Sequence, residues 1–326
     1  MRTLMSAVIA ALVPGLLHAQ TPVSLALDWT LNTNHIGLVV AQDRGYYDEA
    51  GLTVELLPYS DTSSAALLAA GAVDMAYMTS LGFMSARAMG ADLVALWATT
   101  QHDAGRLVYD SANDAITRPA DLSGKVYAGF GSAWEAALIG TMIRNDGGDP
   151  VWDTVTLGTG AYEALATGAV DFTLEVATWE GVNGQLLGRR QSAFRYADHG
   201  IPDQQNGYIG IRGARLAENP DWLDPFMKAT QRGYAWAVEN PEAAADLLIA
   251  RGGFPNEALV HGSLRMLVED GYLHDPARPI GGIDTARFEG MARFLFDAKV
   301  LKDAAGAELD WPGDVSAWHD QDWMTR

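Results

Sequence analysis

Cysteine is absent from the 326-residue chain. The protein can therefore form no disulfide, no thiolate nucleophile and no cysteine-ligated metal site. A lipid-modified N-terminal cysteine is excluded for the same reason. Stability must come from the hydrophobic core, and a hydrophobic content of 48% over this length is enough for about two domains.

Basic side chains are scarce as well. There are 22 Lys and Arg against 41 Asp and Glu, which gives a formal net charge of −19 at pH 7, and the basic residues form no cluster. Nucleic-acid-binding proteins normally present a basic face, so no nucleic-acid partner is expected. The acidic balance indicates a well-solvated surface and does not identify a ligand.

Long apolar runs are missing after the first residues. Arg2 gives a positive start, residues 4–13 are mostly apolar, Pro14 and Gly15 follow, and Leu17-His18-Ala19 resembles a cleavage site. This order predicts a secretory signal peptide over residues 1–19, cleaved near Ala19. The run is shorter than the roughly 20 residues of a membrane-spanning helix. Together with the lack of cysteine, it predicts a soluble periplasmic protein.

Motifs typical of metal sites and enzymes are also missing. The seven histidines show no metal-ligand spacing, so no metal is predicted. Gly129-Phe-Gly131 lacks the Gly-Lys-Ser/Thr ending of a phosphate loop, and no Gly-x-Ser-x-Gly elbow occurs. No nucleophile–base pair is evident, so the sequence predicts neither an enzyme nor a cofactor.

Strand-like and helix-like segments alternate, which indicates parallel βαβ units and an α/β fold. Strands are predicted at 23–27, 53–57, 75–78 and 93–99, with helices at 34–49, 63–70 and 80–89. The pattern restarts with strands at 125–129, 154–157 and 170–176 and helices at 133–145 and 161–166. The last third is predicted to be helical, at 220–238, 241–250, 255–272 and 284–298.

One short sequence occurs twice. Gly71-Ala-Val-Asp74 returns as Gly168-Ala-Val-Asp171, each time between a short helix and an apolar strand. A glycine helix stop followed by a polar turn explains either copy alone, but the shared flanks favour two lobes of similar construction. With crossovers at 106–110 and 207–212, we expect lobe I at 20–107 and 211–326, and lobe II at 108–210.

Ligands of open parallel sheets bind where strands end and helices begin. The four such junctions, at 28–37, 78–86, 129–138 and 175–185, contain no Lys or Arg. They contain three tryptophans and several carboxylates, which suit stacking and N–H recognition of a planar, neutral or cationic nitrogen heterocycle better than capture of an anion. The candidate ligand-binding residues are Asp28, Trp29, Asn32, His35, Thr79, Ser80, Trp134, Glu175, Trp179 and Glu180.

Each candidate also has a purely structural alternative. The tryptophans can be core or helix-packing residues, and Asp28, Asn32, Thr79 and Ser80 can be helix or turn caps. Acids such as Glu135, Glu175 and Glu180 are also favoured in the first turn of a helix. A lone histidine at a helix start, such as His35, is more often a hydrogen-bonded structural residue than a ligand contact.

Several segments resemble one known family. Leu27-Asp-Trp-Thr-Leu-Asn-Thr-Asn-His35, Gly45-Tyr-Tyr and Trp179-Glu-Gly181 are similar to solute-binding proteins related to thiamine-pyrimidine precursor binders and to yeast pyrimidine synthase (NMT1/THI5-like). The resemblance implies a type II periplasmic-binding fold, two α/β lobes joined by a two-stranded hinge, and an ABC transporter permease as partner of a monomer. It also implies ligand contacts from Asp28, Trp29, Asn32 and Glu180. Leu31 stands where many relatives have proline.

The resemblance leaves several ligands and one other class of function open. Hydroxymethylpyrimidine or formylaminopyrimidine is the first choice, and riboflavin, another amine, a sulfonate or nitrate are alternatives. The synthase branch raises an enzyme alternative, whose pattern has a lysine for pyridoxal phosphate, a nearby histidine and a cysteine cluster. Here Met78 stands at the lysine position, Gly82 at the histidine position, and cysteine is absent, so this alternative is disfavoured.

Overall fold

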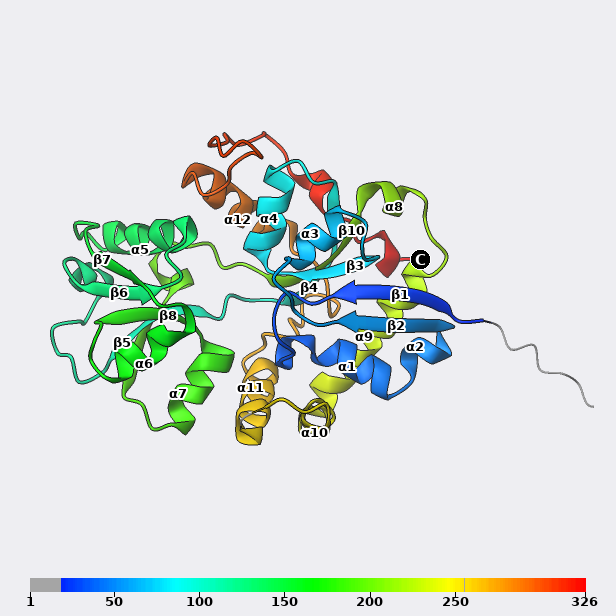
Figure 1. Ribbon diagram of the computed structural model, residues 1–326, viewed down its shortest axis with the longest axis horizontal. Coiled ribbons are helices and arrows are strands. Elements are labelled where there is room, and N and C mark those ends of the chain that lie inside the picture. The colour runs from blue at the N-terminus through cyan, green and yellow to red at the C-terminus, as the bar shows by residue number, and fades with distance from the viewer. Residues whose placement is uncertain (1–18, 255) are drawn as a thin grey trace, which may run out of the picture.

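The computed structural model describes residues 19–254 and 256–326, and the predicted signal peptide lies outside them except for Ala19. Two α/β lobes lie end to end, each around a five-stranded sheet (Figure 1). Within the described residues, none of the helices combines the length and apolar character needed to cross a membrane.

The sheet of lobe I has the strand order β2-β1-β3-β10-β4. The first three strands are parallel, and β10 runs antiparallel to both of its neighbours. The strands are β1 (Thr21–Ala26), β2 (Leu52–Leu57), β3 (Met75–Met78), β4 (Leu93–Thr100) and β10 (Asn206–Arg212), and the connecting helices are α1 (Ile36–Asp43), α2 (Tyr46–Glu49), α3 (Ser64–Ala69) and α4 (Ser80–Ala88).

The sheet of lobe II has the order β7-β6-β8-β5-β9. Here too the first three strands are parallel, and the fourth, β5, is antiparallel to its neighbours. The elements are β5 (Gly105–Asp110), β6 (Val126–Gly129), α5 (Ala133–Asn145), β7 (Asp153–Thr156), α6 (Ala161–Ala166), β8 (Phe172–Val176), α7 (Val182–Leu186) and β9 (Gln191–Arg195).

The two Gly-Ala-Val-Asp segments occupy the same place in the two sheets. Gly71 and Gly168 both have left-handed backbone, with φ of 72° and 74°. Asp74 accepts hydrogen bonds from the N–H and hydroxyl of Ser24 on β1, and Asp171 accepts one from the N–H of Val126 on β6. Each aspartate thus ties the third strand in its sheet order to the second, β3 to β1 and β8 to β6, and the predicted similarity of the lobes is confirmed.

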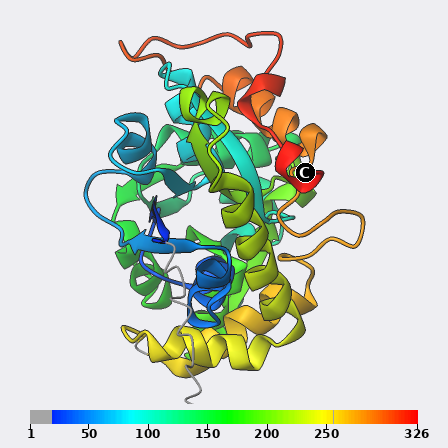
Figure 2. The ribbon, with the colours of Figure 1, turned by 90° about the vertical axis from the view of Figure 1, so that its right-hand side faces the viewer.

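The C-terminal part adds helices that flank lobe I, drawn in yellow-green to red (Figure 2). α9 crosses α1 so closely that a Cβ at Gly233 would lie 2.1 Å from the carbonyl oxygen of Gly37. The helices are α8 (Gly213–Ala217), α9 (Leu223–Glu239), α10 (Pro241–Ala250), α11 (Glu257–Glu269) and α12 (Thr285–Asp297).

The crossovers between lobes differ from the predicted ones. Residues 106–110 and 207–212 lie in β5 and β10, each of which belongs to one sheet, so the predicted lobe limits cut through both strands. The chain instead passes between the sheets at 101–104 and 200–205. The misplacement arose because a short extended run has the same local pattern whether it links two sheets or pairs inside one.

Two further differences concern single elements. The helix predicted over 34–49 is divided into α1 and α2, because Gly45 takes a φ of 72° between them. Strand β9 was not predicted. Its residues do not alternate clearly between apolar and polar, so the sequence pattern does not mark a strand. The strand forms by pairing with β5, which is distant in the sequence.

Candidate functional site

The two sheets direct the same ends toward each other. β1, whose N-terminal end lies at the outer end of lobe I in Figure 1, runs toward lobe II. In lobe II, Gly105 enters directly from the crossover and pairs with Val176, the last residue of β8. The carboxyl ends of the parallel strands of both lobes therefore face the space between them, where ligands of such sheets bind.

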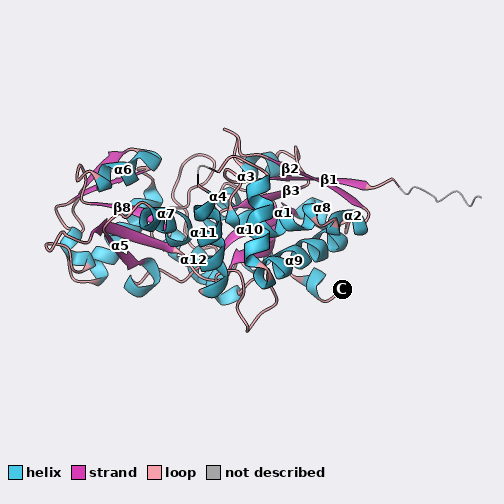
Figure 3. Cartoon of the chain, turned by 90° about the horizontal axis from the view of Figure 1, so that it is seen from below, coloured by secondary structure: helices cyan, strands magenta, loops and turns pink. Residues whose placement is uncertain are grey.

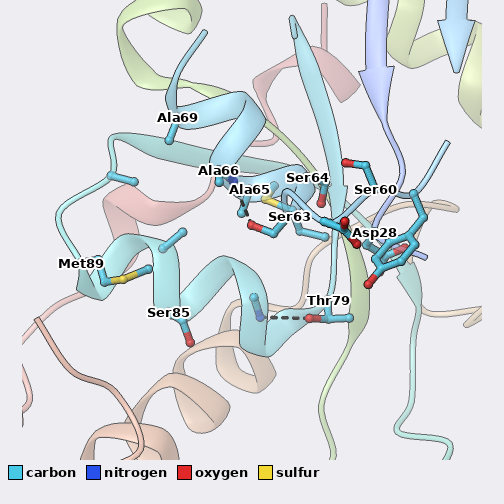
Figure 4. Close-up of a pocket in the computed structure, with 16 residues that line it drawn as sticks. Asp28, Ser60, Ser63, Ser64, Ala65, Ala66, Ala69, Thr79, Ser85 and Met89 are labelled. Carbon is cyan, nitrogen blue, oxygen red and sulfur yellow. Dashed lines mark hydrogen bonds between the residues drawn. The ribbon is translucent and has the colours of Figure 1, made fainter. Parts of the chain in front are cut away.

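A cavity of about 560 Å³ lies between α3 and α4 of lobe I and reaches this edge at Asp28 and Thr79. It is lined by the ends of β1 and β3, the loop after β2, and α3 and α4, and none of the described residues of lobe II contributes to it (Figure 4). Its lining includes Asp28 and Asp61 and contains no basic side chain. The electrostatic character of this wall therefore favours a cation or an N–H donor.

The side chain of His35 forms a hydrogen bond with the carboxylate of Asp28. Asp28 Oδ1 lies 3.1 Å from Nε2 of His35, whose Nδ1 accepts the backbone N–H of Asn32 at 3.2 Å. His35 ends the 3₁₀ turn η1 (Thr33–His35), which Asn32 caps by accepting the N–H of Asn34. Three predicted residues thus meet at one turn, but the His35 side chain is fully buried and does not line the cavity.

An exposed aromatic pair stands beside Asp28. The rings of Trp29 and Tyr59 have centroids 5.0 Å apart and are tilted by 50°. Trp29 is 43% exposed and Tyr59 is 44% exposed. Exposed aromatic faces in a cleft are suited to stacking on a flat ligand. Tyr59 was missed from the sequence, although the junction rule applied to the end of the strand predicted at 53–57 would have included it.

Thr79 and Ser80, next to each other at the start of α4, have different surroundings. Thr79 is exposed, lines the cavity and caps α4 by accepting the N–H of Gly82. Ser80 is buried, and its hydroxyl donates to Gln204 of the second crossover at 2.5 Å. Ser80 therefore connects the cavity wall to the crossover instead of facing the cavity.

Glu175 of lobe II forms an ion pair that the sequence did not predict. It is 1% exposed, and its Oε1 accepts from Arg106 Nε at 2.5 Å, because β5 and β8 place these two residues opposite each other. Burial raises the pKa of Glu175, and Arg106 opposes that shift. The junctions contain no basic residue of their own, so only the strand pairing could reveal Arg106.

Glu180 lies in the turn η4 (Ala177–Gly181) that follows β8. Its Oε2 accepts the backbone N–H of Val176 at 3.1 Å, and burial raises the pKa of its carboxyl. It is partly exposed and remains accessible at the edge of lobe II.

Trp134 and Trp179 contact aromatic side chains of the other lobe. Trp134 at the start of α5 meets Phe294 of α12 edge-to-face at 6.0 Å, and Trp179 meets Phe254 in the same manner at 6.4 Å. Figure 3 shows α11 and α12 at the border with lobe II. Their predicted ligand stacking stays a prediction, and the structure adds an interlobe packing role.

Comparison with known proteins decides the family. The sequence model described as NMT1/THI5 like matches residues 32–244, more than half of the chain. The chain belongs to the NMT1/THI5-like family. A formylaminopyrimidine-binding protein of Halalkalibacterium halodurans is 28% identical over 284 residues, 84% of each chain. A 4-amino-5-hydroxymethyl-2-methylpyrimidine phosphate synthase of Legionella pneumophila is 23% identical over 241 residues, 69% of this chain and 72% of the relative.

Solved structures agree on the architecture of this NMT1/THI5-like protein. A periplasmic sulfonate-binding protein of Methylobacillus flagellatus superposes with a TM-score of 0.70 at 16% identity, covering 95% of this chain and 94% of its own. At that identity the likeness concerns the fold alone. The predicted type II periplasmic-binding fold with two α/β lobes is confirmed.

The enzyme branch of the NMT1/THI5-like family can be compared with the cavity directly. Met78 and Gly82, which the resemblance places at the synthase lysine and histidine positions, both belong to its lining. The cavity wall therefore offers no amine that could hold pyridoxal phosphate. Within the described residues, no group of three or more His, Asp or Glu could hold a metal ion.

The facing edge of lobe II is partly apolar. Phe130, Leu157 and Val176 follow or end its three parallel strands, and each is at least 39% exposed. Large apolar side chains at a strand edge that faces a cavity are suited to covering a ligand held on the opposite wall. They were missed because the sequence search considered only charged, hydroxyl, amide and indole side chains at the junctions.

Proposed function

We propose that this protein is the periplasmic solute-binding component of an ABC importer and captures a planar nitrogen heterocycle of the thiamine-pyrimidine-precursor type, such as formylaminopyrimidine or hydroxymethylpyrimidine. One observation carries the proposal. Asp28 and Tyr59 line a cavity without basic side chains among its described lining residues, and the exposed ring of Trp29 lies against that of Tyr59. The name of the H. halodurans relative supports the same ligand class.

The chemistry of an aminopyrimidine matches this wall. Its exocyclic amine donates hydrogen bonds that a carboxylate accepts, and its flat ring can stack on an indole or phenol face. A hydrogen bond to a charged group contributes about 1.5–3 kcal/mol. Asp28 and Trp29 are therefore the proposed anchors of the ligand, and Thr79, which lines the cavity, and Asn32 are proposed as further contacts.

Lobe II is proposed to complete the site by closing about the crossovers at 101–104 and 200–205. Glu180 would then add a second carboxylate, and the apolar edge would exclude water from the ligand. Exclusion of water strengthens the polar contacts inside the site. The exact limits of the two lobes belong to the proposal, with boundaries at the crossovers that leave β5 and β10 intact.

Sulfonate or nitrate binding is the main rival. Arginine forks are the usual means of holding such anions. The lining contains none, and Arg106 of lobe II is occupied by Glu175. A binding role without catalysis, export from the cytoplasm, a permease partner and a monomeric state belong to the same proposal.

A thermal-shift and calorimetry panel on the mature chain tests the ligand class. Ligand that binds only the folded state raises the melting temperature by mass action. We expect shifts with hydroxymethylpyrimidine and formylaminopyrimidine and none with taurine or nitrate. Shifts confined to the two anions would overturn the proposal, and a shift with riboflavin alone would replace the pyrimidine by a flavin.

A further inference from the structure

We infer that His35 is a positioning residue, a neutral imidazole that fixes the carboxylate of Asp28 so that one of its oxygens is left for the ligand. The inference rests on the proposed function, because it takes Asp28 as the ligand's anchor. It differs from the direct contact predicted for His35, whose side chain is fully buried.

Two hydrogen bonds define the tautomer of the ring. The backbone N–H of Asn32 can only donate, so Nδ1 of His35, which receives it at 3.2 Å, carries no proton. A neutral ring then has its proton on Nε2, which faces Asp28 Oδ1 at 3.1 Å. A doubly protonated ring would set a second N–H against that of Asn32, so the arrangement fits the neutral ring only.

The ring is held so firmly that it can orient its partner. It meets Tyr77 edge-to-face with centroids 4.6 Å apart. The turn that carries it is anchored through the carbonyl of Asn34, which accepts the hydroxyl of Tyr234 at 2.6 Å. A buried and doubly hydrogen-bonded imidazole on an anchored turn has a single available orientation, and Asp28 is aligned to it.

This arrangement leaves the second carboxylate oxygen of Asp28, Oδ2, available to a ligand. Among the described residues none donates a hydrogen bond to Oδ2, while Asp28 itself lines the cavity. A donor on Oδ1 stabilises the charged carboxylate, and Oδ2 is left as an acceptor for an N–H group. His35 thereby makes the wall specific for ligands that donate at this point.

Two substitutions separate this role from a structural one. The amide of His35→Gln reaches the position of Nε2 and can donate to Asp28, whereas that of His35→Asn reaches the position of Nδ1 and can only replace the acceptor for Asn32. We expect His35→Gln to bind hydroxymethylpyrimidine within about fivefold of wild type and His35→Asn to lose roughly 10- to 100-fold, by calorimetry. Equal affinities of the two variants would overturn the inference.

A background without the carboxylate gives the matched control. In Asp28→Ala the difference between His35→Gln and His35→Asn is expected to disappear, because coupling requires both partners. A difference that persists there would mean that His35 acts on the ligand by another route. Melting temperatures of the ligand-free variants show whether each one folds.

One readout needs no ligand and separates this inference from the proposed function. Nitrogen-15 spectra of the imidazole in the ligand-free wild type should show the Nε2–H tautomer for His35. The Nδ1–H tautomer would overturn the inference even if pyrimidines bind. The expected tautomer in a protein that binds no pyrimidine would contradict the proposed function alone.

Discussion

Lobes I and II share one construction but differ in the surfaces that they turn toward each other. Both sheets have equivalent strand orders, and in each an aspartate ties the third strand in that order to the second. In lobe I the junction carboxylate Asp28 lines a cavity next to two exposed rings. In lobe II the acids are largely engaged inside the lobe.

Glu135 and Glu175 show how lobe II uses its acids. Glu135 accepts three hydrogen bonds, from the N–H groups of Phe130 and Ser132 and the hydroxyl of Tyr127. Glu175 is paired with Arg106. The carboxylate of lobe I is thus proposed to serve recognition, and those of lobe II serve internal support. Asp28 lines an open cavity, whereas Glu175 is buried although its Oε2 also has no hydrogen-bond partner among the described residues.

The largest expected effect tests that difference between carboxylates. Asp28→Ala should weaken pyrimidine binding by about 2–3 kcal/mol, because a hydrogen bond to a charged group is lost. Glu135→Ala, the matched change in lobe II, should lower the melting temperature and change the dissociation constant less than threefold. Calorimetry and thermal melts measure both quantities. A larger loss of affinity in the Glu135 variant would reverse the assignment of the two walls.

The tryptophans provide the next comparison. Trp29→Ala should cost about 1–3 kcal/mol of binding free energy if the exposed indole stacks on the ligand. Trp134→Ala removes a ring that meets Phe294 across the lobes, and tests its predicted stacking role. If Trp134→Ala weakens binding as much as Trp29→Ala does, lobe II also supplies a ring that stacks on the ligand. The two lobes would then differ less in their ligand contacts than the structure indicates.

The crossovers give a pH-dependent test. Burial raises the pKa of Asp103 to about 6, against hydrogen bonds from the N–H of Gly105 and the amide of Gln204. Folding therefore favours the protonated form of Asp103. The free energy of unfolding should fall as the pH rises from about 4 to about 6, because the folded protein must then carry a buried charge. Asp103→Asn should flatten this slope and gain about 1–2 kcal/mol of stability at pH 7 relative to wild type. Denaturant unfolding from pH 4 to 8 measures the slope, and an unchanged slope would contradict the burial of this charge.

The smallest expected effect compares the two repeated aspartates. Asp74 accepts two hydrogen bonds from Ser24, whereas Asp171 accepts one from Val126. Asp74→Ala should therefore destabilise the protein by about 1–2 kcal/mol and Asp171→Ala by about 1 kcal/mol or less. The corresponding Asp→Asn variants keep an acceptor and serve as controls. An equal loss in both lobes would show that the second bond contributes little.

The sequence by itself determined the parts that depend on local patterning. The alternation of helices and strands, the repeated glycine stop with its aspartate, and the lack of cysteine and of basic residues at the junctions are properties of neighbouring residues. They were sufficient to predict two similar α/β lobes and to place Asp28 at a strand end, where it lines a cavity, because strand ends and helix starts are locally encoded.

Tertiary structure alone decided which of the candidate side chains are free. Arg106 reaches Glu175 only because an antiparallel strand from the crossover lies between β8 and β9. His35 is buried behind Asp28 because the turn that carries it is anchored to α9 through Tyr234. The hydrogen-bond partner of a side chain is set by segments distant in the sequence. For that reason local patterns could predict candidate residues at the strand ends but not the contacts that each of them makes.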